Sequence, residues 1–298
     1  MWYYLNGQFV EDANATVSVT DRAFLYGDGC FEGLGVTQGK IPHLDDHIDR
    51  FYRSARMLRI EVPITASALR IAILQTGSRN GMRDVAGAYM RPLLSRGSGP
   101  LGVKNSRKVG PPTLVIIPQM TGRETLFGDH IEICNAVLTR YARTGSASLD
   151  PAIKSNNYLT SILAFMEAQD LDPDVDVAVL RDPQGFLAEG HAMNLFTVKD
   201  GRILTPMSSG ALRGITRHHV LNIARGLGYE TIETNLSDYD LVCADEAFVT
   251  SAMESIAAIG RVNGEALPGP IPGPITRRLR AAYLEHAIAT ATEIPPTA

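Results

Sequence analysis

Cysteine is scarce in this 298-residue sequence, which has only Cys30, Cys134 and Cys243. The three are far apart and none belongs to a CxxC pair, so the sequence contains no zinc-binding pattern and we predict no metal site. An odd number of isolated thiols is typical of a reducing compartment rather than of a disulfide-stapled secreted domain. We therefore expect a cytoplasmic protein.

Blocks of like charge and long apolar runs are also missing. The net charge is −4 and no basic block is present, which argues against binding to nucleic acid or to a membrane surface. The longest apolar runs fall well short of a membrane span. The first residues, MWYYLNGQFVEDA, lack a basic lead followed by an apolar core, so we expect no signal peptide.

What remains is the composition of a soluble globular protein, with 45% hydrophobic and 20% charged residues. Strand-like and helix-like segments alternate in both halves of the chain, and several turns are typical of hairpins. The polar stretch QMTGRETLFGD separates the halves. We predict an α/β protein with α+β character and mixed or antiparallel sheets. Its small domain would cover 1–118, a linker 119–130, and a large domain with Lys154 would cover 131–298.

Local patterns predict individual elements. Asn6-Gly7 between WYYL and QFV predicts a hairpin, because both residues tolerate positive φ. Apolar residues spaced three or four apart predict helices at 43–58 and 65–79. Ser155 or Asn156 is expected to cap a further helix, beginning directly after Lys154. Other predicted segments are strands at 86–96 and 112–118, helices at ITRHHVLNIARGLG and about 274–290, and a disordered tail, TEIPPTA.

Two motifs favour an ordinary structural role. GSGPLG (97–102) matches the GxGxxG pattern of dinucleotide sites, but VKNSRKVGPP follows it and cannot begin the helix that such a site needs. A glycine-rich substrate loop is the better interpretation. His43 and His47 are four apart, and His218 and His219 are adjacent, but neither pair has a third metal ligand at convincing spacing. We predict that these histidines lie on solvated helix faces.

Lys154, in IKSNNYLT, is in an unusual place for a surface lysine. A lysine at the start of a helix is mildly disfavoured, because unpaired N–H groups make that end positive. Two interpretations stay open at this point. The residue is either structural, or an amine held in a pocket to bond covalently with a carbonyl compound.

Three further features supply the other groups that a pyridoxal cofactor needs. Glu189, in FLAEGHAMNLF, is either a surface carboxylate or an acid that keeps a pyridine nitrogen protonated. Gly214-Ile215-Thr216 is either an ordinary helix start or a phosphate site, since free N–H groups bind anions there. Arg50, in HIDRFYRSA, is either a surface arginine or a partner of the same phosphate.

With these residues in view, the sequence resembles the class IV (fold type IV) pyridoxal-phosphate aminotransferases. It is most similar to the branched-chain amino-acid aminotransferases. The resemblance covers about residues 2 to 290. It rests on seven motifs in the family's order: VTDRAFLYGDGCFEG, HLDDHIDRFYRSARML, AYMRPLLSRGSGPLG, IKSNNYLTSILA, AEGHAMNLF, GALRGITR and ADEAFVTSAMESI.

The resemblance implies a role for each matching residue. Lys154 would bond to the cofactor's aldehyde and carry the proton that leaves the substrate's α-carbon, and Glu189 would pair with the pyridine nitrogen. The other cofactor residues implied are Arg50, Tyr158, Asn194, Gly214, Ile215, Thr216, Ser251 and Ala252. The implied substrate residues are Tyr26, Phe31, Gly33, Tyr89, Arg91, Leu101, Val103 and Met253. Leu101 and Val103 match residues that reach a partner subunit's pocket, so the family implies at least a homodimer.

Two positions depart from the branched-chain pattern. Where those enzymes continue FEG with an apolar residue and arginine, this sequence has Leu34-Gly35. Where they have Gly-Thr-Ala-Ala-Glu, this sequence has SAMES (251–255), so Ala252 replaces a phosphate-binding threonine. Losing one neutral hydrogen bond costs about 0.5–1.5 kcal/mol, and Ser251 could compensate.

The resemblance implies a pyridoxal-phosphate enzyme that moves the α-amino group of leucine, isoleucine or valine to 2-oxoglutarate by a ping-pong mechanism. An aromatic pocket with Arg91 at its rim would take both a branched side chain and the carboxylate of glutamate. The departures leave three relatives of the same fold open: aminodeoxychorismate lyase, D-amino-acid aminotransferase and (R)-amine transaminase. A scaffold without catalysis is disfavoured, because the cofactor residues are present.

Overall fold

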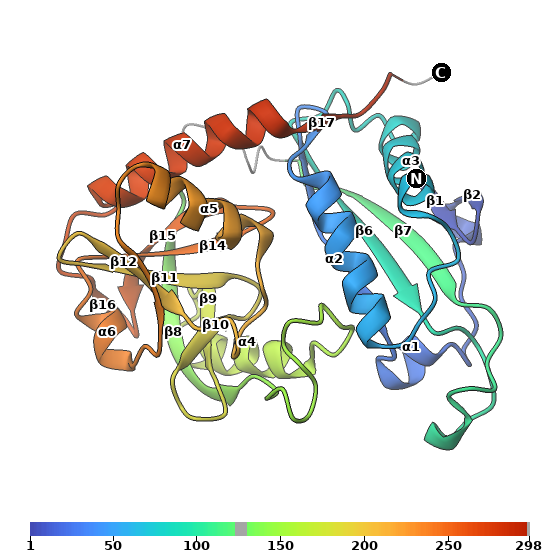
Figure 1. Cartoon of the computed structure of the whole chain (residues 1–298), viewed down its shortest axis with the longest axis horizontal. Coiled ribbons are helices and arrows are strands. Elements are labelled where there is room, and N and C mark those ends of the chain that lie inside the picture. The colour runs from blue at the N-terminus through green and yellow to red at the C-terminus, as the bar shows by residue number, and fades with distance from the viewer. Residues whose placement is uncertain (123–129, 297–298) are drawn as a thin grey trace. The chain divides into compact units, whose positions relative to one another are not determined.

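A computed structural model describes residues 1–122 and 130–296. The chain divides into two compact units (Figure 1). Unit 1 consists of Met1–Phe127, Ile153–Asn157 and Ala287–Ala298, and unit 2 of Gly128–Ala152 and Tyr158–His286. The linker predicted at 119–130 falls mostly on 123–129, outside the described residues. Lys154 belongs to unit 1, although the segments on both sides of Ile153–Asn157 belong to unit 2.

Unit 1 contains an antiparallel sheet. Eight strands of its described residues pair in the order β17-β5-β4-β6-β7-β1-β2, with β3 added beside β6. The hairpin β1–β2 turns at Asn6 and Gly7, whose φ angles are 49° and 93°, as predicted. The strands are β1 (Trp2–Leu5), β2 (Gln8–Glu11), β3 (Gly29–Phe31), β4 (Leu34–Thr37), β5 (Lys40–Ile41), β6 (Gly87–Ser95), β7 (Thr113–Met120) and β17 (Thr292–Glu293).

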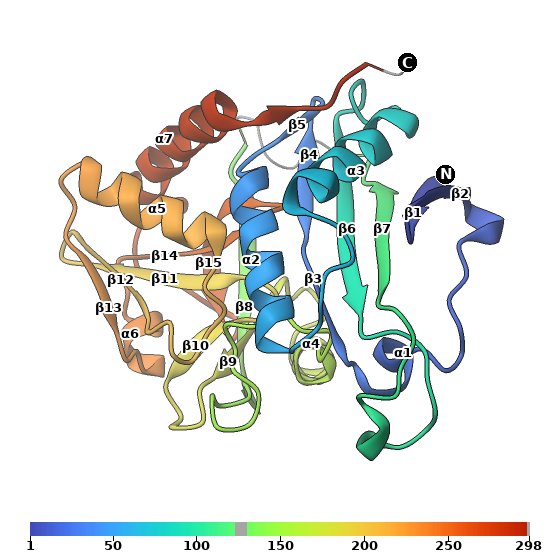
Figure 2. The same ribbon diagram turned by 45° about the vertical axis from the view of Figure 1, so that its right-hand side comes forward.

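The helices α2 (Leu44–Met57) and α3 (Ala66–Arg79), close to the predicted bounds, pack on one face of this sheet (Figure 2). The short helix α1 (Arg22–Tyr26) precedes β3 in the chain. Phe51 of α2 and Ile73 of α3 are buried in the same core as Met90 of β6. A 3-10 turn, Val103–Asn105, follows GSGPLG, where a dinucleotide site would need an α-helix.

The tail that we predicted to be disordered is ordered as far as Pro296. β17 pairs with β5, and the Ile294 N–H donates to the Gly39 carbonyl at 2.8 Å. The Ile294 side chain is fully buried in the core of unit 1. The prediction was wrong because the sequence of a proline-rich chain end does not show that distant residues, here β5 and the core of unit 1, bind it.

Unit 2 contains a mixed sheet, which confirms the predicted sheet type. Nine strands of its described residues pair in the order β10-β9-β8-β15-β14-β11-β12-β13, with β16 beside β15. The pairs β8–β9, β8–β15 and β12–β13 are parallel. The strands are β8 (Ile133–Ala142), β9 (Val177–Arg181), β10 (Leu187–Gly190), β11 (Asn194–Lys199), β12 (Arg202–Pro206), β13 (Thr231–Thr234), β14 (Glu246–Ser251), β15 (Ser255–Val262) and β16 (Glu265–Ala266).

Helices cover both faces of this sheet, so its central strands are buried on both sides. On β9, Val179 packs in the core that includes Leu241 of α6 (Asp238–Val242). The next residue, Leu180, packs in the core that includes Ala164 of α4 (Leu159–Leu171). Alternate residues of a strand point to opposite faces, which explains why the first four residues of β9, Val177 to Leu180, are all apolar. The other helices are α5 (Ile215–Gly226) and α7 (Pro274–Thr290).

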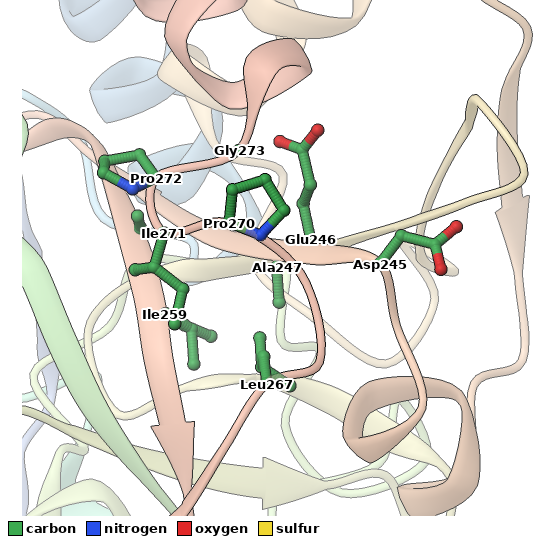
Figure 3. A pocket seen from close by; sticks show the side chains of 10 residues that line it. Asp245, Glu246, Ala247, Ile259, Leu267, Pro270, Ile271, Pro272 and Gly273 are labelled. Atoms are coloured by element: carbon green, nitrogen blue, oxygen red, sulfur yellow. The ribbon is translucent and has the colours of Figure 1, made fainter.

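A small pocket in unit 2 is part of the scaffold (Figure 3). The Glu246 carboxylate reaches from β14 to the start of α7, where it accepts the N–H groups of Ile275 at 3.0 Å and Thr276 at 2.8 Å. A Cβ at Gly273 would collide with this carboxylate. Glu246 therefore caps α7, which is favourable because the helix start is positive. Across both described ranges, no helix is long and apolar enough to span a bilayer.

Candidate active site

Lys154 lies in an extended segment that pairs with β3. The Phe31 N–H donates to the Lys154 carbonyl at 2.9 Å, and the Asn156 N–H donates to the Gly29 carbonyl at 2.9 Å. The chain is therefore extended past Lys154, and α4 begins only at Leu159. The prediction of a helix capped by Ser155 or Asn156 was wrong, because backbone pairing with a distant strand overrides the local preference.

The amine of Lys154 lies over the ring of Phe31, a residue that the sequence marked for substrate. Its Nζ lies 4.8 Å from the centroid of the Phe31 ring. The guanidinium of Arg91 lies 4.7 Å from the same centroid, and its Nε donates to the Tyr89 hydroxyl at 3.0 Å. A Cβ at Gly33 would come within 2.8 Å of that hydroxyl, so glycine leaves room for Tyr89. Unit 1 thus brings four candidate substrate residues together beside Lys154.

Three other candidate substrate residues form a second group in unit 1. The Tyr26 hydroxyl accepts the N–H of Gly102 at 2.9 Å, which joins the end of α1 to the GSGPLG loop. On that loop Leu101 and Val103 are 66% and 74% exposed. Large apolar side chains so exposed are typical of surfaces that another molecule covers.

Arg50 is held by a buried acid. Its Nε and one Nη donate to the two oxygens of Glu32, at 2.7 and 2.8 Å. Nδ1 of His47 lies 2.7 Å from the second oxygen, and because a carboxylate only accepts, this nitrogen carries the proton. Burial alone would raise the pKa of Glu32, but the charge and hydrogen bonds of Arg50 and the hydrogen bond of His47 lower it to about 2.

Two of the histidines predicted on solvated faces are buried. His43 and His47 are 7% and 4% exposed, so that prediction was wrong for both. Burial lowers the pKa of His47 further than the hydrogen bond to Glu32 raises it, which favours the neutral ring. The error arose because α2 places His47 on the same side as Arg50, facing an acid that the local pattern does not show.

In unit 2, both carboxylate oxygens of Glu189 have polar partners, one an ion pair and the other two hydrogen bonds. Its side chain is buried, with Oε1 2.7 Å from the Nε of Arg143. The Oε2 atom accepts from the Asn194 amide at 3.3 Å and from the Leu212 N–H at 3.0 Å. The two hydrogen bonds and the charge of Arg143 favour the ionised carboxylate, which is the form that can pair with a protonated ring nitrogen.

Asn194 connects Glu189 to the start of α5. Its amide also donates to the Leu212 carbonyl at 2.9 Å. A Cβ at Gly214 would collide with the Asn194 side-chain oxygen, so this position requires glycine. Gly214 is the N-cap of α5 and offers no side-chain cap, which leaves the helix start suited to an anion.

Two hydroxyl groups expected at a phosphate are engaged within the protein. The Thr216 hydroxyl donates to the Ser251 carbonyl at 3.0 Å, which ties α5 to the turn after β14. The Ser251 hydroxyl accepts the N–H groups of Met253 at 3.1 Å and Glu254 at 3.0 Å, and donates to the Glu254 carboxylate. Ala252 lies half-buried within this turn. The backbone N–H groups at the start of α5 are therefore the stronger candidates for a phosphate.

Each unit holds groups that suit the chemistry of pyridoxal phosphate: unit 1 has an amine and an arginine, and unit 2 has a buried acid and a helix start without a side-chain cap. Sequence reasoning missed Glu32, His47 and Arg143. Arg50 and His47 are three apart on α2, but basic residues at this spacing are also common on solvated helix faces, so the sequence does not reveal the buried acid. Nothing local marks Arg143, because its partner is on another strand.

Comparison with known proteins places the chain among enzymes. Residues 29–262 match the model of the family Amino-transferase class IV. A Methanocaldococcus jannaschii protein named "Putative branched-chain-amino-acid aminotransferase" is 38% identical over 288 residues, 95% of this chain and 95% of the relative. The branched-chain-amino-acid aminotransferase of Pseudomonas aeruginosa is 31% identical, over 96% of this chain and 92% of the relative.

Solved structures give the same likeness. A branched-chain amino acid aminotransferase from T.th., crystallised with pyridoxamine 5'-phosphate, superposes with a TM-score of 0.89 at 31% identity. The match covers 99% of this chain and 98% of that one. The branched-chain aminotransferase of Thermoproteus uzoniensis, solved with norvaline, gives a TM-score of 0.87 at 29% identity and covers 99% of each chain.

Proposed function

The chain belongs to the class IV aminotransferases, which depend on pyridoxal 5'-phosphate, and we propose that it moves the α-amino group of a branched-chain L-amino acid to 2-oxoglutarate. The observation that carries this proposal is the full-length likeness to proteins named for branched-chain amino acids. The reaction runs in two halves, and the oxo-acid formed from the amino donor leaves before 2-oxoglutarate enters.

Each candidate residue has a defined task in this proposal. When bound, the cofactor supplies an electron-poor ring that stabilises negative charge at the substrate's α-carbon. The Lys154 amine takes the α-proton and returns it. The Glu189 carboxylate pairs with the ring nitrogen. Arg50 and the N–H groups of Ile215 and Thr216 hold the phosphate.

The group around Phe31 suits two different substrates. The Phe31 and Tyr89 rings offer apolar surface to a branched side chain, and Arg91 offers a cation to the side-chain carboxylate of glutamate. Arg91 is exposed, and the hydroxyl of Tyr89 accepts a hydrogen bond from its Nε. Its guanidinium can therefore turn toward solvent when the substrate side chain is apolar. Tyr158 is proposed to hydrogen-bond the cofactor's ring oxygen.

The test is the transfer of nitrogen from leucine to 2-oxoglutarate. We expect purified protein with added cofactor to form glutamate. Lys154→Ala should lose about 10²- to 10⁴-fold in kcat, because general acid–base catalysis contributes that much. Lys199→Ala is the matched control, since Lys199 is a surface lysine paired with Asp245 at 2.8 Å. Unchanged activity in Lys154→Ala would place the chemistry elsewhere.

One alternative has a structural argument. In the turn 251–255, Ala252 replaces a threonine of the branched-chain pattern, and Glu254 brings a carboxylate into the same turn. A negative charge there would weaken binding of a substrate carboxylate. A lyase that releases pyruvate from aminodeoxychorismate is the alternative, because the substrate positions Gly35 and Ala252 both depart from the branched-chain pattern. It is favoured if the protein binds the cofactor but transfers nitrogen from none of a panel of L- and D-amino acids.

We also infer that the enzyme works as a cytoplasmic homodimer. The support within unit 2 is α4, which buries small residues and exposes large apolar ones. Leu159, Ile162 and Met166 are 67%, 54% and 55% exposed and lie on one face of the helix. A second copy of the chain would remove this face from water.

A further inference from the structure

Arg143 follows the last residue of β8, and its side chain reaches the carboxylate of Glu189. The arginine Nε lies 2.7 Å from Glu189 Oε1. The two side chains are 12% and 7% exposed, so salt and water screen the pair little. Among the described residues, the Nε–H meets no acceptor in good hydrogen-bond geometry, so the contact is one of charge.

The backbone explains why an arginine makes this contact. β8 and β10 flank β9, and paired strands are about 4.8 Å apart, so a side chain from β8 has to span about 10 Å to reach β10. The backbone N–H of Arg143 donates to the Arg181 carbonyl at 2.8 Å, which holds the backbone of Arg143 beside β9. Glu189 lies opposite Leu180 on the other side of β9. Arginine is long enough to cross this gap.

The contacts of Glu189 divide into two kinds. Asn194 and Leu212 donate neutral hydrogen bonds to Oε2, which set the orientation of the carboxylate. Arg143 adds a positive charge at Oε1. Both kinds of contact favour the ionised carboxylate, and the charge of Arg143 adds an attraction that the neutral acid does not feel.

We propose that Arg143 is a positioning residue that keeps the shared proton of the Glu189–pyridine pair on the ring nitrogen. The inference rests on the proposed function, in which Glu189 pairs with that nitrogen. A pyridine nitrogen and a carboxylate have comparable basicity. The proton can therefore lie on the ring nitrogen, which gives an ion pair, or on the carboxylate, which gives a neutral acid facing a neutral ring. Arg143 disfavours that arrangement because it is in contact with the carboxylate itself.

A purely structural Arg143 would behave differently. Its replacement would then lower the stability of unit 2 or weaken cofactor binding, but would leave the proton on the ring. The position of the proton is therefore the measurement that separates the two roles. It can be read from the ¹⁵N signal of the ring nitrogen, which differs strongly between protonated and neutral pyridine.

The experiment loads the wild type and Arg143→Met with pyridoxal 5'-phosphate that carries ¹⁵N in its ring. At neutral pH the wild type should give the protonated-ring signal, and Arg143→Met should move toward the neutral-ring signal. The kcat for leucine should fall by about tenfold, the change that one pH unit in a proton equilibrium produces, with a smaller change in KM. Arg143→Lys keeps the charge and should restore the ring signal.

Arg181→Met is the matched control. Arg181 lies on the neighbouring strand β9 and forms its own ion pair, with Asp238 at 2.6 Å. Its loss removes an arginine of the same sheet but should leave the ring signal unchanged. If Arg143→Met does not fold, Arg143→Gln serves as the neutral variant, because it keeps a polar side chain.

An unchanged ring signal in the neutral variant overturns the proposal. A neutral ring in the wild type overturns it as well, by removing the role given to Glu189. Transfer from leucine to 2-oxoglutarate is measured on the same samples. Wild-type activity together with an unaltered ring signal in the variant would leave the proposed function intact and reject only the role of Arg143.

Discussion

At the scale of single residues, burial without a charged partner keeps a histidine of unit 2 neutral. Burial lowers the pKa of His191 to about 4. Its ring packs on Phe165, with the centroids 4.5 Å apart, and its Nδ1 accepts the Ala178 N–H at 3.4 Å. The folded protein therefore keeps this histidine neutral under mildly acidic conditions, in which the unfolded chain binds a proton.

We predict that mild acid weakens unit 2 through His191. Its folded pKa of about 4 lies below the unfolded value of 6.5, so between these values the unfolded state binds more protons and stability falls as the pH falls. At about pH 5 the loss should be about 2 kcal/mol. His191→Asn keeps an acceptor for the Ala178 N–H, and its free energy of unfolding should fall less than that of the wild type when the pH is lowered. Urea unfolding of the apoprotein at about pH 7.5 and pH 5 measures the difference.

The control for this prediction is His130→Asn, because His130 is exposed. This variant should keep the wild-type dependence on pH. If His191→Asn and the wild type lose the same stability between the two pH values, the neutral state of His191 does not contribute to acid sensitivity.

At the scale of elements, the chain end acts as part of unit 1. The short strand β17 extends the sheet at β5, and Ile294 fills a space beside Gly77 of α3, where a Cβ would come within 2.7 Å of it. The hydroxyl of Ser78, also on α3, donates to the Pro296 carbonyl at 3.1 Å. The last residues therefore join the sheet to the helix that covers it.

We predict that Ile294→Ala destabilises unit 1 by about 2–4 kcal/mol, because it leaves a cavity in a packed core. Ile288→Ala, at a position 42% exposed, should cost less than about 0.5 kcal/mol. Thermal or urea unfolding of both variants measures these values. Equal stability of the two variants would mean that the chain end does not contribute to the core.

At the scale of the whole molecule, α4 exposes large apolar side chains that the proposed homodimer would cover. Inward positions of this helix are small, including Ser161, Ala164 and Ala168, which lets it lie close to β8 and β9. Outward positions are large and apolar. A helix that serves only its own fold has the reverse distribution.

We predict that Ile162→Glu combined with Met166→Glu converts a dimer into monomers, since the added charges would be buried without partners. Analytical ultracentrifugation should show half the mass of the wild type. Asn222→Glu, at an exposed position of a different helix, α5, should leave the mass unchanged. A doubly substituted protein that stays dimeric would place the interface elsewhere.

Periodic segments were predictable from the sequence to within a few residues. The pattern of α2 and α3 and the hairpin at Asn6-Gly7 depend on neighbours in the chain, and the structure confirms them. The motifs around Lys154 and Glu189 indicated the family, which the comparisons confirm. The start of α4, the ordered tail and the buried His47 were not predictable, because each depends on a partner more than ten residues away.

The sequence by itself determined the family and the cofactor and indicated candidate side chains for it, because these depend on residue types in a fixed order. Only the tertiary structure decided which groups orient and charge those side chains. Arg143 meets Glu189 across β9, Glu32 holds Arg50, and β3 keeps the backbone of Lys154 extended. The physical reason is that charge and hydrogen bonding act over a few ångströms of space, whatever the distance along the chain.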